Sequence, residues 1–275
     1  MPHQSSARPT RTGVTPVHVL AGSRTDTGPN RANNQDCVAV WPETPGDRPE
    51  KGVLALVADG MGGHKGGEIA SGIASKTIPM IYSNHPAQPQ EALLRAFETA
   101  NEEIYLAARK NGSLAGMGTT CTAVAVVKGQ AYLAHIGDSR MYLVRAGAIY
   151  VMTDDHSATR VLVKQGLLPA AEAKQHDERN VILRAMGTRP KVEVETWSAP
   201  FSLWPGDRLV LCSDGLYETI ADEEIAGAAT RHLPQDACRE LIRLAVERNT
   251  SDNATVSILA LESGLETTVE TDGSR

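Results

Sequence analysis

The stretch Val53–Gly67, VLALVADGMGGHKGG, sets an unbroken apolar run directly before Asp59 and a glycine-rich segment directly after it. An apolar run of this length followed by glycine is typical of a buried strand that ends in flexible backbone. The stretch therefore predicts that the carboxylate of Asp59 lies at the end of a strand.

Four other aspartates stand at the same kind of position. Asp138 and Asp214 follow apolar runs, whereas Asp36 and Asp252 precede them. Gathered carboxylates repel one another, so a fold that brings these strand ends together needs cations between them. Oxygen donors without a His or Cys cluster favour hard cations such as Mg²⁺ or Mn²⁺.

The bulk composition is that of a globular domain and excludes several function classes. The 275 residues carry a net charge of -6 without a long basic run, which argues against a nucleic-acid partner. No apolar stretch is long enough to span a bilayer, so we expect no membrane partner, and we expect residues 1–16 to be a mobile arm without a signal peptide. The four dispersed cysteines favour buried free thiols and a cytoplasmic protein.

Helices are expected in pairs between blocks of strands. Helical periodicity covers 68–82 and 90–110, and again 222–231 and 235–248. Lys128-Gly129 and Ala146-Gly147 predict antiparallel hairpins between these pairs. This order disfavours a doubly wound parallel sheet and favours antiparallel sheets packed face to face with helices outside.

One working domain is expected over 17–261. Residues 154–190 combine a short helical stretch with polar sequence, which indicates a subdomain inserted between two strands. Residues 262–275 lack an apolar period and are expected to form a mobile tail.

The predicted carboxylate cluster suits hydrolysis of phosphoesters. Two ions close together lower the pKa of a bridging water and neutralise charge on the electrophile. The carbonyl of Gly60 can add a ligand, and Arg31 can clamp a phosphate with two hydrogen bonds. The glycines after Asp59 fit neither common nucleotide-binding loop, because Lys65 stands where a further glycine is needed.

A serine hydrolase is the rival enzyme class. Ser139 offers a nucleophile, and His135 or His156 offers a base. Ser139 has no G-x-S-x-G elbow, however, and this mechanism leaves the other aspartates without a role.

Seven short strings, in order, resemble the motifs of the metal-dependent type 2C (PPM) serine/threonine protein phosphatases, particularly the bacterial branch. They are RANNQD (31–36), ADGMGGH (58–64), GTT (118–120), GDSR (137–140), TDDHS (153–157), CSDGL (212–216) and SDNAT (251–255). The match spans roughly 17–261. One such string is weak evidence, whereas seven in register are strong.

The resemblance implies an α+β fold, a four-layer α-β-β-α sandwich of two mainly antiparallel sheets flanked by helix pairs. It further implies hydrolysis of phosphoserine and phosphothreonine by direct attack of a metal-bridging water or hydroxide, with two Mn²⁺ or Mg²⁺ ions in the core site and a possible third. The substrates would be phosphorylated proteins, targets of a serine/threonine kinase, and we expect a monomer. A degenerate domain that binds phosphoproteins without turnover is the non-enzymatic alternative.

Site roles follow from the same resemblance. Asp59 resembles the carboxylate that bridges both ions, and Gly60 the backbone ligand of the second ion. Asp214 and Asp252 resemble ligands of the first ion, and Asp36 the carboxylate that orders a metal-bound water. The remaining correspondences are Asp138 with the third-ion site, Arg31 with the phosphate-binding arginine, and 154–190 with a mobile flap.

Two positions depart from the family pattern. Gln35 stands where many members carry a glutamate ligand, and Met61 where eukaryotic members place a histidine proposed as the general acid. His64 lies nearby and either protonates the leaving group or makes only a local hydrogen bond.

Overall fold

Two antiparallel sheets form the centre of the computed structural model, which describes residues 17–42, 50–62 and 66–263. One sheet has the strand order β1-β12-β11-β7-β8, and the other has the order β10-β6-β5-β3-β2 with β4 and β9 paired at its margins. The strands of the first are β1 (Val17–Asp26), β7 (Arg140–Arg145), β8 (Ala148–Val151), β11 (Arg208–Cys212) and β12 (Ala254–Ser263). Those of the second are β2 (Asp36–Trp41), β3 (Val53–Met61), β4 (Gly118–Thr119), β5 (Cys121–Val127), β6 (Gln130–Ile136), β9 (Glu195–Thr196) and β10 (Phe201–Ser202).

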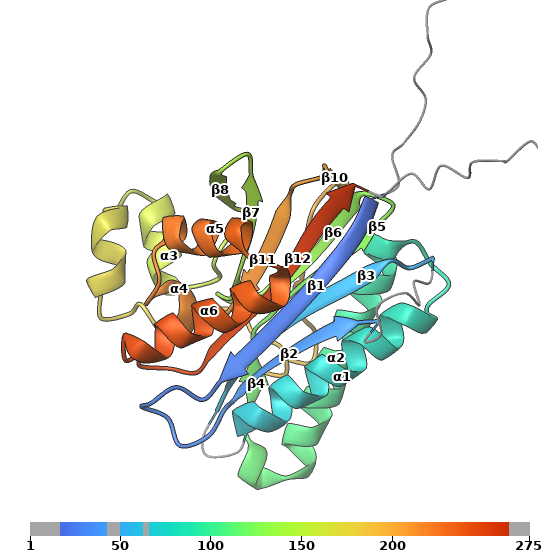
Figure 1. The fold of residues 1–275 in the computed structure, drawn as a ribbon. Helices are drawn as coiled ribbons and strands as arrows, with labels where there is room; N and C mark the ends of the chain where they lie inside the picture. The colour runs from blue at the N-terminus through green and yellow to red at the C-terminus, as the bar shows by residue number, and fades with distance from the viewer. Residues whose placement is uncertain (1–16, 43–49, 63–65, 264–275) are drawn as a thin grey trace, which may run out of the picture.

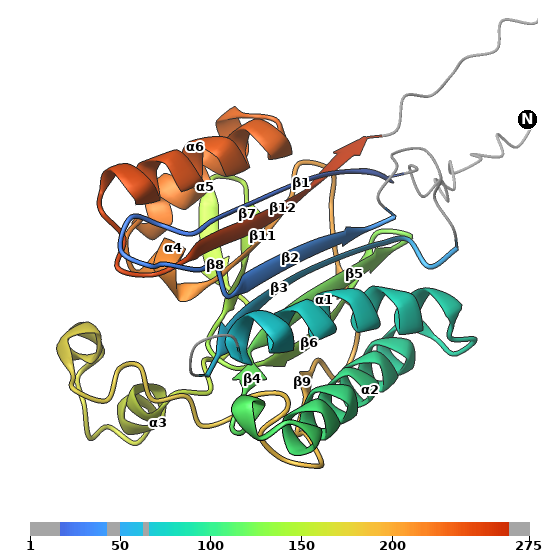
Figure 2. The same cartoon turned by 90° about the horizontal axis from the view of Figure 1, so that it is seen from below.

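Helices cover the outer face of each sheet (Figures 1 and 2). The long pair α1 (Gly66–Asn84) and α2 (Pro89–Lys110) packs on the sheet that contains β3, and the turn η1 (Gly112–Leu114) follows it. The helices α4 (Asp214–Tyr217), α5 (Asp222–Arg231) and α6 (Pro234–Glu247) cover the sheet that contains β12. The predicted α-β-β-α sandwich is therefore confirmed.

The apolar run before Asp59 is continuous because both faces of β3 are buried. Leu54, Leu56 and Ala58 pack toward α1 and α2, whereas Ala55 and Val57 pack in the core between the sheets. Side chains alternate between the two faces of a strand, so a strand buried on both sides has no polar position. Burial of each leucine contributes roughly 2 kcal/mol.

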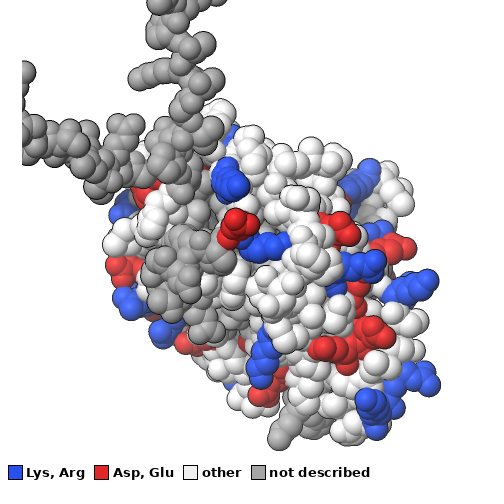
Figure 3. Space-filling view, turned by 90° about the vertical axis from the view of Figure 1, so that its right-hand side faces the viewer, with Lys and Arg blue, Asp and Glu red and all other residues white. Residues whose placement is uncertain are grey.

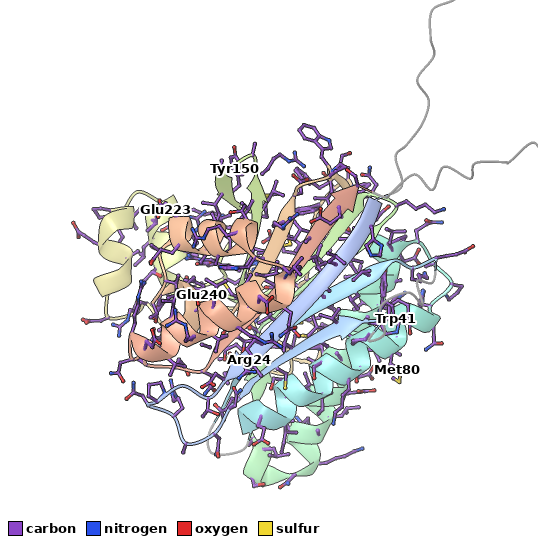
Figure 4. The ribbon with its side chains drawn as sticks, in the orientation of Figure 1. Arg24, Trp41, Met80, Tyr150, Glu223 and Glu240 are labelled. Atoms are coloured by element: carbon purple, nitrogen blue, oxygen red, sulfur yellow. The ribbon has the colours of Figure 1, made fainter. Side chains whose placement is uncertain are left out.

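Two aromatic rings pack together between α1 and the sheet, at the end of β2 that is farthest from Asp36. The rings of Trp41 on β2 and Tyr82 on α1 meet edge to face with centroids 6.3 Å apart. Figure 4 shows Trp41 beside α1, and the exposed Met80 lies on the same helix nearby. This contact fixes α1 along the sheet, with its first residues near the end of β3.

The two predicted hairpins are present. Lys128 and Gly129 both have positive φ, 51° and 74°, and they join β5 to β6. Ala146 and Gly147 have φ of 51° and 81° and join β7 to β8. Two consecutive left-handed residues give the turn whose twist matches paired strands.

The segment expected to be an insertion lies between β8 and β9. It contains α3 (Ala158–Lys164) and the turn η2 (Ala170–Gln175), and it projects from one end of the sandwich (Figure 2). Isolated bridges pair Ser157 with Ile182 and Thr119 with Met186. The segment that enters the insertion is thus paired with the segment that leaves it, and the leaving segment is paired with β4 of the second sheet.

The chain ends differ slightly from the expectation. β12 continues to Ser263 and pairs with β1, so Glu262 and Ser263 belong to the sheet and not to a tail. Arg208 stabilises this extension through an ion pair with Glu262. The other residues expected in the two terminal arms lie outside the described part of the chain.

All four cysteines are free, and Cys121, Cys212 and Cys238 are buried. The described segments contain no helix with the length and hydropathy needed to cross a bilayer.

Candidate metal centre

Five aspartates approach one another at one end of the two sheets. Asp36 is the first residue of β2 and lies opposite Asp59 of β3 in the antiparallel register. Asp214 opens α4 directly after β11, Asp252 precedes β12, and Asp138 lies between β6 and β7. The charges of the other four all act on Asp59. The fold thus brings together all five aspartates that the sequence singled out.

Burial and mutual repulsion oppose ionisation of these carboxyl groups. Burial raises the pKa of Asp36 and of Asp138 to about 6, with smaller contributions from neighbouring carboxylates. Burial also raises the pKa of Asp59 and of Asp214 well above the ordinary value, and the neighbouring aspartates raise it further. A cluster of this kind is stable in its ionised form when cations neutralise it.

Two oxygen atoms of the cluster have no hydrogen-bond partner within the part of the chain that the structure describes. Asp138 Oδ1 and Asp214 Oδ1 are buried and accept no hydrogen bond from the described residues. Buried polar atoms are normally satisfied, so these two oxygens suit a cation. The donors are all oxygens, which are the ligands that Mg²⁺ and Mn²⁺ prefer.

The residues therefore fit the expected ions by chemistry and by these unsatisfied oxygens. Within the described ranges, however, no three His, Cys, Asp or Glu side chains converge closely enough to hold one ion as they stand. Ligation requires the carboxylates to rotate about their side-chain bonds. The strand positions place the aspartates in one shared electrostatic field, and carboxylate rotamers change more readily than strand positions.

Threonines hold the backbone of Asp59 at the end of β3. The Thr120 amide and the Thr119 hydroxyl both donate to the Asp59 carbonyl at 2.8 Å. The Asp59 amide donates to Thr120 Oγ1 at 3.1 Å. These residues form part of the Gly-Thr-Thr string, and their role is to fix the direction in which Asp59 leaves the strand.

Glycines are required beside Asp59. A Cβ on Gly60 would lie 2.2 Å from the Gly67 carbonyl oxygen, and one on Gly67 would lie 2.6 Å from the Gly60 carbonyl oxygen. The first turn of α1 can approach β3 this closely only when both positions lack a side chain. The glycine-rich stretch after Asp59 therefore allows a close backbone approach between β3 and α1.

Asp36 is held by hydroxyl groups from the opposite sheet. Ser213 donates to Asp36 Oδ2 at 2.7 Å, and the same hydroxyl accepts from the Thr255 amide at 3.0 Å. Thr255 also contributes a side-chain hydrogen bond to Asp36. Sequence reasoning did not single out these supporting residues. Their signal was a hydroxyl side chain directly before Asp214 and another three residues after Asp252.

Arg31 lies at the exposed margin of the cluster. Its guanidinium forms a 2.6 Å ion pair with Asp252 Oδ2 and donates through Nε to the Ser251 carbonyl at 3.2 Å. Half of its side chain is exposed. A partly solvated guanidinium in this position can be shared between a carboxylate and an incoming anion.

Gln35 lies beside the glycines and not at the centre of the cluster. Its carbonyl accepts from the Gly60 amide at 3.1 Å and from Ser71 at 2.6 Å. Its side-chain amide is within 3.4 Å of the Gly62 carbonyl. His64, the candidate general acid, lies outside the described residues.

The insertion borders the cluster on the side of Asp138. A small pocket of about 70 Å³ is lined by Asp138 and Asp214 together with Asp155 and Arg179 of the insertion. Arg140 binds Asp155 through both of its oxygens, and its guanidinium stacks on a tyrosine ring 3.9 Å away. The insertion therefore contributes side chains to the margin of the candidate site.

The residues of the serine hydrolase alternative are arranged differently from a catalytic triad. Ser139 is fully buried, and its hydroxyl is 2.7 Å from Thr120 Oγ1. His135 binds Thr122, and His156 accepts from the Gly137 amide and faces Glu195. A buried serine bonded to a threonine has no base and no access to substrate, so the structure argues against this mechanism.

Asn253 ties the loop that carries Arg31 to the start of β12. Its side chain accepts from the Gln35 amide at 2.8 Å and donates to the Thr27 and Asn33 carbonyls at 2.7 and 3.0 Å. It is 4% exposed. In the sequence Asn253 stands in the string SDNAT, directly after the candidate ligand Asp252.

Asn253→Ala is therefore expected to destabilise the protein by about 2–4 kcal/mol, because buried backbone groups lose their partners. Urea unfolding measures this change. Asn84→Ala is the matched control, since Asn84 is exposed and its side chain donates to Met80 and Ser83 of its own helix. For this variant we expect a change of at most about 0.5 kcal/mol. Equal losses in the two variants would contradict this role for Asn253.

Comparison with known proteins gives one consistent result. A family model described as "Protein phosphatase 2C" matches residues 29–248. The serine/threonine phosphatase stp of Listeria innocua is 35% identical over 207 residues, which cover 74% of this chain and 79% of that protein.

Solved structures agree with this family. The serine/threonine phosphatase PstP/Ppp of Mycobacterium tuberculosis superposes with a TM-score of 0.79 at 34% identity, covering 89% of this chain and 99% of that one. The catalytic domain of PstP in complex with two manganese ions gives a TM-score of 0.78 at 32% identity, covering 90% and 99%.

Proposed function

Because the chain belongs to the protein phosphatase 2C family and is a metal-dependent serine/threonine phosphatase, we propose that its active site is the cluster of five aspartates. The observation that carries this assignment is the convergence of aspartates from both sheets, with two buried oxygens that have no hydrogen-bond partner among the described residues. Asp59 would bridge two ions, with the Gly60 carbonyl on the second ion and Asp214 and Asp252 on the first.

Mn²⁺ or Mg²⁺ supplies a nucleophilic water at neutral pH and neutralises charge on the phosphoryl oxygens when bound. The chain's own residues orient the reaction. Asp36, held by Ser213 and Thr255, keeps a fixed acceptor beside Asp59. Arg31 would exchange part of its contact with Asp252 for the phosphate of the substrate. Asp138 would help to hold a third ion together with Asp214.

We propose phosphorylated proteins, targets of a serine/threonine kinase, as substrates. We further propose that 17–263 form one catalytic domain, with 154–190 as a flap at its site, and that the protein is a cytoplasmic monomer. Its free cysteines suit a reducing compartment. On the face shown in Figure 3, acidic and basic side chains are interspersed, which gives a nucleic acid no continuous basic surface on the described part of that face.

Asp214→Asn tests the proposed ligands through the affinity of the protein for Mn²⁺. We expect this variant to bind Mn²⁺ at least about tenfold more weakly, because a neutral amide is a poorer donor than a carboxylate. Isothermal titration calorimetry measures the affinity. Glu223→Gln on α5 (Figure 4) removes one carboxylate from an exposed site away from the cluster and should leave the affinity unchanged. Unchanged Mn²⁺ binding in Asp214→Asn would contradict the proposed ligand set.

A further inference from the structure

A basic pocket lies on the segment that leads from the insertion back to β9. It has a volume of about 170 Å³ and is lined by Arg184, Arg189 and Lys191, with Glu193 as its single acidic residue. The whole chain has a net charge of -6. A local excess of positive charge in an acidic protein indicates a site for an anion.

Two cations of the pocket, Arg189 and Lys191, carry positive charge that no carboxylate among the described residues neutralises. Arg184 faces Glu193 at 3.5 Å, a long and solvent-exposed contact with side chains 48% and 82% exposed. Arg189 and Lys191 are both exposed, and neither has an ion-pair partner in the described ranges of the chain. An exposed cation without a carboxylate partner can bind an incoming anion without breaking an existing ion pair.

The backbone of the pocket is held firmly by α2. Asn101, which is 2% exposed, accepts from the Gly187 amide at 2.8 Å and donates to the Arg189 carbonyl at 3.1 Å. Gly187 has a φ of 82°, and a Cβ there would lie 2.1 Å from a methyl carbon of Ile104. The pocket is therefore presented by a fixed backbone, although its charged side chains are exposed.

The same segment begins beside the aspartate cluster. Met186 and Thr119 exchange backbone hydrogen bonds, and the Thr119 hydroxyl donates to the Asp59 carbonyl. A Cβ on Gly118 would lie 2.9 Å from Thr188 and 3.5 Å from Met61, the residue that ends β3. Backbone segments in direct contact with one another therefore connect Asp59 to the pocket.

We propose that the pocket formed by Arg184, Arg189 and Lys191 binds an anionic residue, a carboxylate or a second phosphate, that flanks the phosphorylated residue of the substrate. An extended peptide advances about 3.3 Å per residue, so a residue only a few positions from the phosphate can reach a neighbouring pocket. This inference rests on the proposed active site. It names the substrate class as phosphoproteins with an acidic flank.

Peptides of one phosphothreonine sequence test the subsite. Glu, phosphoserine or Gln is placed at successive positions on either side, and kcat/KM is measured with Mn²⁺. For the best position we expect kcat/KM about three- to tenfold higher with Glu than with Gln, a difference that falls at high salt. A preference for phosphoserine alone identifies the anion as phosphate and supports the proposal equally.

Arg189→Gln/Lys191→Gln is expected to remove this preference while hydrolysis of the Gln peptide and of p-nitrophenyl phosphate stays unchanged. Arg109→Gln/Lys110→Gln, the same two residue types at the end of α2, should keep the preference. The absence of any charge preference in the wild type would refute the subsite, as would an equal loss on every substrate in the first double variant. Failure of the wild type to hydrolyse p-nitrophenyl phosphate with Mn²⁺ would instead refute the proposed active site, and the subsite with it.

Discussion

Asp59→Asn is expected to lower phosphatase activity by at least about a thousandfold, which is the scale of losing a central charged group in a metal-assisted site. Asparagine matches the shape of aspartate, and the backbone of residue 59 stays bonded to Thr119 and Thr120. The variant therefore keeps the fold while it removes the charge proposed to bridge two ions. Initial rates on p-nitrophenyl phosphate and on a phosphothreonine peptide measure the loss.

The stability of the same variant distinguishes a ligand from a structural residue. Burial and four neighbouring carboxylates raise the pKa of Asp59, so its charge is unfavourable in the protein without metal. We therefore expect Asp59→Asn to be more stable than the wild type in chelator at pH 7.5. A large loss of stability would mean that Asp59 supports the fold, and retained activity would refute the assignment outright.

Removal of divalent cations is expected to reduce activity to below about 1% of its level with Mn²⁺, because the proposed mechanism relies on bound ions to activate the attacking water. Dialysis against a chelator followed by titration with Mn²⁺ or Mg²⁺ measures the loss and its recovery. Full activity in excess chelator would refute the metal mechanism.

Metal removal should also change how stability depends on pH. The pKa values of Asp36 and Asp138 are raised to about 6 from 3.8, so the folded state binds more protons than the unfolded state. Their contribution to stability is complete below pH 3.8 and is lost as the pH rises through 6. In chelator we expect up to about 2 kcal/mol to be lost per group between pH 4 and 7.5.

Saturating Mn²⁺ should oppose that loss, because ions that bind the ionised carboxylates stabilise only the folded state. The stabilisation by Mn²⁺ is therefore expected to grow from pH 5 to pH 7.5. Urea unfolding at both pH values, with and without the ion, provides the measurement. Stabilisation by Mn²⁺ that is the same at both pH values would contradict binding of the ion by the carboxylates whose pKa is raised.

The sandwich could be predicted from the sequence because its strands and helices carry strong local patterns. The run before Asp59 is apolar on both faces of β3, and the hairpin residues at 128–129 and 146–147 adopt the left-handed backbone that the turns require. The extension of β12 to Ser263 was not predictable from apolar periodicity, because an ion pair between Arg208 and Glu262 supports it.

The aspartates were recognisable, whereas the residues that position them were not. Asp59 and its companions recur at strand margins, which is a pattern that can be read along the chain. Ser213, Thr120 and Asn253 act across contacts between residues distant in sequence, and a single hydroxyl or amide next to a turn has many alternative explanations. Only the packing of one sheet on the other reveals which groups they face.

The division of the site between both sheets also determines when the protein becomes an enzyme during its synthesis. Asp36 and Asp59 belong to strands made early, whereas Asp252 lies two residues before β12, which pairs with both β1 and β11. Until the ribosome has released β12, β1 and β11 lack the strand that lies between them. A chain that ends before Asp252 therefore lacks both this aspartate and the strand that joins β1 to β11, and it cannot assemble the proposed site.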